Sequence, residues 1–407
     1  MTLVATAMGL ACTEAGYQID RFPVRLDPDA GVPVLWASYG DHPPVRVVVD
    51  TAAPVTVLYG ESAADRRRID LTVAGWTDLA IVPRLRFLAA PVLVLPRPAD
   101  LCLSPRAGCD AGGLLGGDLL SRVAVRLDLT DWRLSFFHDS AADDEWFAEA
   151  CNAVFHSVMA GGGTFEWGDG EVSYSGTRFV VGACLERTDN ESASWYSSGR
   201  NALLLLTTGA HPLVLSESAF RRLFPESEQP TLQFDTLLGN IGGAGAVYAH
   251  LATESLKRVA FVAQENDKWG PCEELQASIL LACGACRTGA DLTCPCEYDQ
   301  ERCAAASSVV VDATATSEDF VPVAVIRDTE GFLQGVREEV RPGLADVDGL
   351  IGIDILRRFV VDLDYPGGRL IFRHRAEPAP GVTIWPAISS PEAAAHRLNH
   401  CLSATCP

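Results

Sequence analysis

Two segments decide the fold: GLLGGDLLSRVAVRLDLTDWRLSFF at residues 113–137 and GLIGIDILRRFVVDLDYPGGRLIFR at residues 349–373. They align without a gap, and twelve of the 25 positions are identical. Each is preceded by an apolar stretch, a short polar turn and a second apolar stretch, VRVVVDTAAPVTVL at 45–58 and NALLLLTTGAHPLVL at 201–215. Self-similarity of this kind is typical of an internally duplicated chain. The sequence therefore predicts two related halves.

Composition narrows the class of protein. The chain has 407 residues, of which 48% are apolar, enough for large cores. The formal charge of −21 argues against nucleic acid and anionic membrane surfaces as partners, because both would repel it. We expect a globular protein.

The N-terminal segment, residues 1–19, is similar to a secretory signal. Its apolar run MTLVATAMGLAC ends at Cys12, which resembles the lipidated cysteine of a bacterial lipobox. The alternative is an ordinary buried terminus. We expect export to a bacterial periplasm or cell surface, with a possible lipid anchor at Cys12.

Thirteen cysteines favour an oxidising compartment and disulfides. Cys102 and Cys109 enclose a small loop and are expected to pair. Six more crowd between Cys272 and Cys303, where four thiolates offer a zinc site as the alternative to disulfides. The expected compartment favours disulfides, so we expect no metal and no cofactor.

Turn residues and apolar patterns divide the chain further. Residues 20–138 and 166–376 are strand-rich and are expected to form two β lobes, the second with a cysteine-rich insertion at about 265–305. Residues 139–165 form a helical linker in this interpretation, because 143–160 carry helix-like spacing that ends at Gly161–Gly163. Residues 377–407 are a Pro- and Ala-rich tail.

The repeated pattern of apolar strand, Asp-Thr-Gly-Ala-like turn, apolar strand and Gly-x-Asp-x-Leu segment resembles the pepsin and retropepsin aspartic peptidases. The resemblance covers roughly residues 30–376 apart from the insertion. It implies a mainly β, bilobal pepsin-like fold with two pseudo-symmetric β lobes around a cleft. Because one chain carries both halves, a monomer is expected.

The family's chemistry needs two carboxylates that share one proton, one acting as general base and the other as hydrogen-bond donor to the peptide carbonyl. By resemblance, Asp50 takes the first catalytic position, Thr51 the loop-fixing position, and Ala52 stands where the family has Gly. In the second turn Thr207 replaces the other catalytic Asp. It is followed by the expected Thr208, Gly209 and Ala210.

Thr207 removes a carboxylate, because its hydroxyl does not titrate near neutral pH. The favoured hypothesis is a pseudo-peptidase that binds a peptide or protein in the inter-lobe cleft. The alternative is an active aspartic endopeptidase that uses Asp50 with Thr207 or with another acid.

Other residues have simpler interpretations. The resemblance implies that Asp118 and Asp354 are structural residues at the starts of short helices, where an acid complements the helix dipole. His211 is a replacement base only if it reaches the site. The glycines at 239, 242, 243 and 245 suggest either a flap hairpin or a plain loop.

Overall fold

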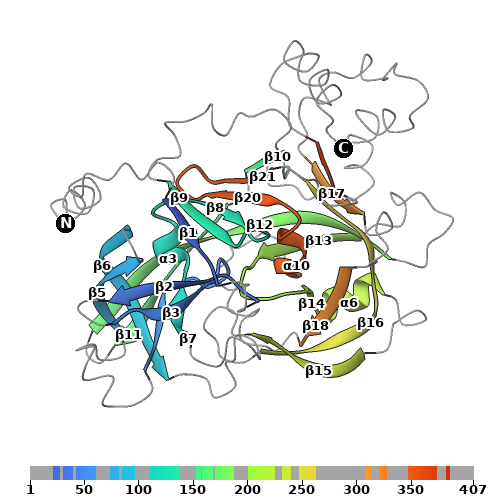
Figure 1. Cartoon of the computed structure of the whole chain (residues 1–407). Helices are drawn as coiled ribbons and strands as arrows, with labels where there is room; N and C mark the ends of the chain where they lie inside the picture. Colours follow the sequence, from blue (N-terminus) through green and yellow to red (C-terminus); the bar gives the residue numbers. More distant parts are fainter. Residues whose placement is uncertain are drawn as a thin grey trace, which may run out of the picture.

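The computed structural model describes sixteen stretches of the chain and shows that they are mainly β, as predicted. They are residues 22–27, 31–39, 43–60, 74–81, 85–96, 111–137, 153–156, 158–167, 170–187, 200–224, 232–239, 247–262, 308–312, 321–327, 347–373 and 382–385. The strands form three sheets (Figure 1).

The first sheet is a closed barrel built from the N-terminal half. Its order is β2 (Val34–Tyr39), β3 (Val45–Val49), β7 (Ala111–Leu115), β4 (Val57–Gly60), β6 (Leu85–Pro96) and β5 (Ala74–Ile81), and β5 closes on β2. Short alternating strands with apolar inward faces suit a barrel, because closure leaves no edge unpaired.

The second sheet belongs mostly to the C-terminal half. Its order is β11 (Val158–Trp167), β12 (Gly170–Arg187), β13 (Arg200–Leu206), β19 (Gly349–Ile351), β14 (Leu213–Ser216), β18 (Val321–Ile326), β16 (Val247–Val262), β17 (Ser308–Asp312) and β22 (Val382–Trp385). β15 (Leu232–Gly239) pairs with β16 beside this path.

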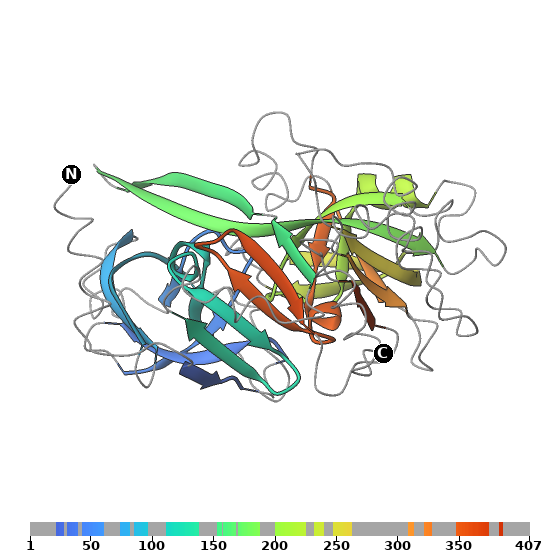
Figure 2. The same cartoon turned by 90° about the horizontal axis from the view of Figure 1, so that it is seen from above.

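The third sheet joins the two halves. Its order is β1 (Phe22–Arg25), β9 (Arg133–Phe137), β8 (Ala124–Asp128), β20 (Val360–Asp364), β21 (Arg369–Arg373) and β10 (Ala153–His156). β8 and β9 come from the first repeat copy, β20 and β21 from the second, and the two hairpins lie side by side (Figure 2).

The repeat copies have the same strand pairings in the same register. β3 runs parallel to β7 with Val47 opposite Gly113, and β13 runs parallel to β19 with Leu204 opposite Gly349. β4 pairs antiparallel with β7, and β14 pairs antiparallel with β19 in the equivalent register. Each copy then enters a short helix, α3 (Gly117–Leu120) or α10 (Ile353–Leu356). The internal repeat is therefore structural as well as sequential.

Close approach of backbones explains one repeated glycine. A Cβ at Gly113 would lie 2.2 Å from the carbonyl oxygen of Val57, and one at Gly349 would lie 2.0 Å from that of Val214. Only glycine fits where a strand crosses its neighbour this closely.

The helix predicted over 143–160 is wrong where the structure describes it. Residues 153–156 form β10, which pairs with β21, and 158–167 form β11, which pairs with β12. Gly161–Gly163 lie within β11 and do not end a helix. Short apolar runs do not distinguish helix from strand, and here pairing with neighbouring strands decides the conformation.

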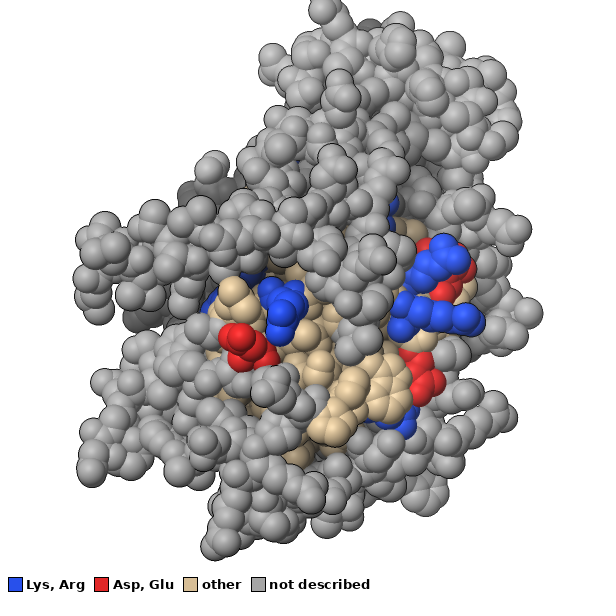
Figure 3. All heavy atoms as spheres, turned by 60° about the vertical axis from the view of Figure 1, so that its left-hand side comes forward, with Lys and Arg blue, Asp and Glu red and all other residues tan. Residues whose placement is uncertain are grey.

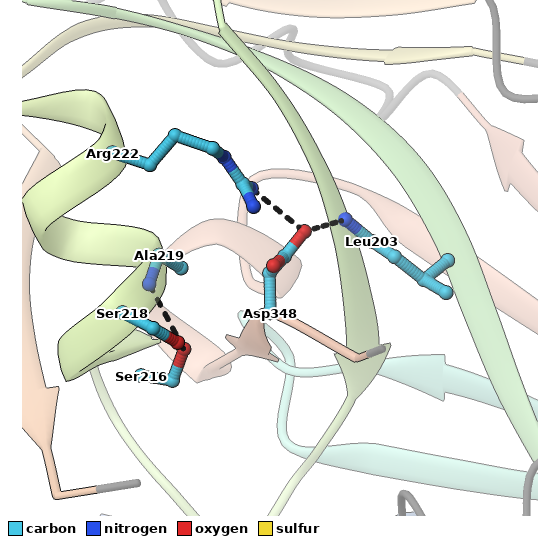
Figure 4. Close-up of polar contacts among 6 residues, drawn as sticks. All are labelled: Leu203, Ser216, Ser218, Ala219, Arg222 and Asp348. Atoms are coloured by element: carbon cyan, nitrogen blue, oxygen red, sulfur yellow. Dashed lines mark hydrogen bonds and ion pairs between the residues drawn. The ribbon is translucent and has the colours of Figure 1, made fainter. Parts of the chain in front are cut away.

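Asp348, which lies just before the second repeat copy, connects neighbouring elements of the C-terminal half (Figure 4). Its Oδ2 accepts a hydrogen bond from the Leu203 amide at 2.9 Å and lies 3.0 Å from Nη2 of Arg222 on α6 (Glu217–Leu223). The helix begins beside it, with Ser216 as the N-cap that accepts from the Ala219 amide. One carboxylate thus connects β13, β19 and α6.

Several predictions fall outside the described residues. These include residues 1–21 with Cys12, most of the tail, and every cysteine except Cys184, which is buried in β12. Among the described segments, no helix has the length and apolar character needed to cross a bilayer. On the face in Figure 3, the described acidic and basic side chains lie in mixed groups.

Candidate functional site

Each turn is held by the repeat copy of its own half. The Asp50 amide donates to the carbonyl of Leu115 at 3.1 Å, and the Thr207 amide donates to that of Ile351 at 2.9 Å. These four residues occupy equivalent positions in the two halves, so the turns start from matching geometry.

The first residue of each short helix also holds the turn of its own half through a backbone hydrogen bond. The Gly117 amide of α3 donates to Ala53 O, and the Ile353 amide of α10 donates to Ala210 O, both at 2.8 Å. Two rigid elements therefore fix each turn, which is the kind of support that a preorganised site needs.

The structure brings Asp50 and Thr207 into contact. Thr207 Oγ1 donates a hydrogen bond to Asp50 Oδ1 at 3.0 Å. Each side-chain oxygen also accepts from an amide of its own turn, Asp50 Oδ1 from Ala52 at 2.9 Å and Thr207 Oγ1 from Gly209 at 3.0 Å. The hydroxyl of Thr207 therefore has the hydrogen-bonding position of one carboxylate oxygen.

Thr51 and Thr208 tie the two turns together. The Thr51 amide donates to Thr208 Oγ1 at 3.2 Å, and that hydroxyl donates to Val49 O at 2.5 Å. In the opposite direction, Thr51 Oγ1 donates to Leu206 O at 3.0 Å. Thr51 and Thr208 are 157 residues apart in the sequence, so these bonds connect the two halves of the chain. The pairing of Asp50 with Thr207 therefore depends on both threonines.

The whole centre is buried. Asp50, Thr51, Ala52, Thr207, Thr208 and Ala210 each have 0% of their surface exposed. Buried polar groups need hydrogen-bond partners, and the side chains of Asp50 and Thr207 supply one another with such a bond. The pair consists of one carboxylate and one hydroxyl, so it has one titratable carboxyl group fewer than a pair of aspartates.

Tyr365 is a neighbour of the site that sequence reasoning missed. Its hydroxyl is buried and has no hydrogen-bond partner in the described part of the chain, and its ring packs on Phe179 with centroids 4.7 Å apart. Burial raises the pKa of Tyr365, and the negative charge of Asp50 raises it further. The signal in the sequence was the repeat position, where Leu129 of the first copy is replaced by Tyr.

Asp118 lies in the first turn of α3, at the start of a short helix as predicted. Its Oδ1 accepts from the Thr56 hydroxyl at 2.7 Å and from the Leu119 amide at 2.9 Å. Burial raises the pKa of Asp118 to about 6, although the hydrogen bonds from Thr56 and Leu119 and the charge of Arg122 oppose the shift. Its second oxygen has no partner among the described residues.

Asp354 has the equivalent position in α10 but different surroundings. Leu213 stands where the first half has Thr56, and Asp354 lies 3.6 Å from Arg357 with a quarter of its side chain exposed. Both acids therefore start short helices, but only Asp118 is tied to a turn by a hydroxyl.

The remaining candidates are an exposed residue, the end of a strand and residues outside the described ranges. His211 is exposed, and its ring lies against Gly31. A Cβ added at Gly31 would be 3.1 Å from Nε2 of His211. Gly239 ends β15, while glycines 242, 243 and 245 are outside the described residues. Within the described ranges, no three His, Cys, Asp or Glu residues gather as a metal site would require.

Comparison with known proteins gives no family. No protein-family model matches the chain, and no curated protein matches its sequence.

Proposed function

We propose that the chain is a pepsin-like protein with an incomplete catalytic dyad, which binds a peptide or unfolded polypeptide between its halves without cleaving it. The observation that carries this proposal is the hydrogen bond of 3.0 Å between Thr207 Oγ1 and Asp50 Oδ1. By the resemblance, this hydroxyl takes the place of the second carboxylate that proton-sharing chemistry needs.

The electrostatics of the pair support the absence of hydrolysis. In an aspartic peptidase, one ionised and one protonated carboxyl group act together as base and acid. Thr207 donates a hydrogen bond but does not take up or release a proton near neutral pH. Loss of a general acid or base typically lowers a rate by about 10²- to 10⁴-fold.

The matching geometry of the two turns supports a binding role. Amide and hydroxyl bonds still fix both turns, from Thr51, Thr208 and the two repeat copies. Binding needs this preorganisation, whereas proton transfer additionally needs the second acid.

A second candidate function is an active aspartic endopeptidase. One observation favours it: the Thr207 hydroxyl lies beside Asp50, with Oγ1 3.0 Å from Oδ1. In this candidate the hydroxyl turns its single proton from Asp50 to the substrate carbonyl oxygen, which it polarises while Asp50 acts as base. This candidate predicts cleavage that depends on Asp50.

A binding experiment tests the proposal. The full-length chain is titrated against a fluorescently labelled, reduced and carboxymethylated polypeptide, and anisotropy is followed with pepstatin as competitor. We expect saturable binding, displacement by pepstatin and recovery of the polypeptide intact by mass spectrometry. Absence of binding contradicts the proposal, and shortened polypeptide favours the second candidate.

Export and lipidation are part of the proposal. We infer that residues 1–19 direct export and that Cys12 carries lipid, from the apolar run that ends at this cysteine. Labelling of expressing cells with an alkyne fatty acid tests this point: a labelled band that disappears in Cys12→Ser supports it, and an equally labelled variant contradicts it.

A further inference from the structure

The third residue of one turn packs against the first residue of the other. A Cβ at Gly209 would lie 2.7 Å from Oδ2, 2.8 Å from Cγ and 3.0 Å from Oδ1 of Asp50. Contacts under 3.0 Å are essentially never made by real Cβ atoms. The carboxylate of Asp50 therefore fits in this position because residue 209 has no side chain.

The opposite pair of residues is related to this one by the internal repeat. Ala52 corresponds to Gly209, and Thr207 corresponds to Asp50. The two turns share the same bonds, since the third-residue amide donates to the first-residue side chain at 2.9 Å in one turn and 3.0 Å in the other. Ala52 is fully buried. From this equivalence we expect its Cβ to face the side chain of Thr207, as position 209 faces Asp50.

Side-chain length decides what fits against that Cβ. Threonine ends at the two atoms attached to its own Cβ, whereas aspartate extends one bond further to two oxygens. The geometry at Gly209 shows that a carboxylate in this place leaves no room for a methyl group opposite it. Ala52 is compatible with Thr207 and crowds an aspartate.

We propose that Ala52 is a positioning residue for Thr207, so that the two departures from the family pattern are one coupled change. Ala52 fills the space that the missing carboxyl group needs, and a carboxylate pair returns only when Ala52→Gly accompanies Thr207→Asp. This inference rests on the proposed function only in taking residue 207 as the place of a lost carboxylate; the packing does not depend on it.

A double-mutant cycle tests the coupling. Unfolding by urea is measured for the full-length chain and for Ala52→Gly, Thr207→Asp and the double variant. We expect Ala52→Gly alone to increase the unfolding constant by about 2- to 5-fold, because glycine is more flexible than alanine. In the Thr207→Asp background, the same change should decrease that constant by about 10-fold or more.

Two further variants keep the test decisive. Ala53→Gly adds the same flexibility to the same buried turn and should increase the unfolding constant in both backgrounds. Thr207→Asn has the shape of aspartate without its charge, so it gives a second cycle if Thr207→Asp does not fold.

The outcomes separate the inference from the proposed function. Equal effects of Ala52→Gly in the threonine, aspartate and asparagine backgrounds overturn the coupling and leave the binding proposal standing. Cleavage by the wild-type chain overturns the binding proposal and leaves the cycle unaffected. Rescue by Ala52→Gly but not by Ala53→Gly supports the inference.

Discussion

Arg126 and Asp362 occupy the same position in the two repeat copies and face each other across β8 and β20. Arg126 Nε lies 2.6 Å from Asp362 Oδ1, and Nη2 lies 3.0 Å from Oδ2, so the ion pair is bidentate. The two residues are register partners, and an axis relating the copies passes between them. Opposite charges at equivalent positions mean that neither half can pair with a copy of itself here without placing like charges together.

Charge reversal at this pair tests how strongly it joins the halves. Arg126→Asp puts a second acid opposite Asp362, whose side chain is only 2% exposed, and should lower the free energy of unfolding by about 3–5 kcal/mol. The swapped variant Arg126→Asp/Asp362→Arg should recover most of the loss in urea denaturation. Arg86→Asp, at an exposed position of β6, is the control and should change stability by about 0.5 kcal/mol or less. A swap no more stable than Arg126→Asp would contradict the role of the pair.

The threonines of the two turns should contribute unequally to stability. Thr208→Val removes the acceptor of the Thr51 amide and the donor to Val49 O, and should cost about 2–4 kcal/mol. Thr51→Val removes only its hydroxyl bond to Leu206 O and should cost about 1–2 kcal/mol.

Chemical denaturation measures both threonine variants against Thr130→Val, an exposed position whose hydroxyl donates to Arg357 O. The control should lose less than about 1 kcal/mol. Equal, small losses at positions 51 and 208 would show that the turns are not held together by these bonds.

Asp118 should make stability depend on pH between about 4 and 6. Its pKa in the folded chain is about 6, above the usual 3.8, so the folded state binds the proton more tightly than the unfolded state. The resulting stabilisation is complete below the unfolded pKa and is lost as pH rises through the folded one, a change of roughly 3 kcal/mol.

Denaturation midpoints measured from pH 3 to 8 check this dependence in the wild type and in Asp118→Asn. The variant should lose the decline between about pH 4 and 6. Asp354→Asn, at the equivalent position, is the matched control. An unchanged pH profile in Asp118→Asn would contradict the assignment.

Gly349 should tolerate no side chain. Gly349→Ala forces a Cβ to within 2.0 Å of a backbone oxygen, and we expect a loss of more than about 4 kcal/mol or no folded protein. Gly31→Ala, where the nearest atom is the His211 ring at 3.1 Å and φ is 73°, should lose about 1–2 kcal/mol. Similar thermal midpoints for the two variants would contradict the close strand crossing.

The repeat made much of this structure predictable from the sequence. The repeat predicted the paired turns, because equivalent residues of a duplicated unit take equivalent positions. The resemblance to aspartic peptidases added the contact of Asp50 with Thr207 and the short helices at Asp118 and Asp354. The helix at 143–160 failed because strand pairing is a long-range interaction that local spacing does not record.

Burial was the other feature that the sequence did not reveal. Burial raises the pKa of Asp118, and a hydrogen bond from Thr56, which lies 62 residues away, opposes that rise. The charge of Asp50 likewise acts on Tyr365, a residue of the other half of the chain. The repeat showed both positions, but the physical properties follow from neighbours brought together by folding.

The central claim is that one carboxylate stands where hydrolysis needs two. Its most direct test is the initial rate of cleavage of a denatured protein by the full-length chain from pH 3 to 7, with and without pepstatin, beside Asp50→Asn. We predict no pepstatin-sensitive cleavage by either protein at any pH. Pepstatin-sensitive cleavage by the wild type that is lost in Asp50→Asn would contradict the claim.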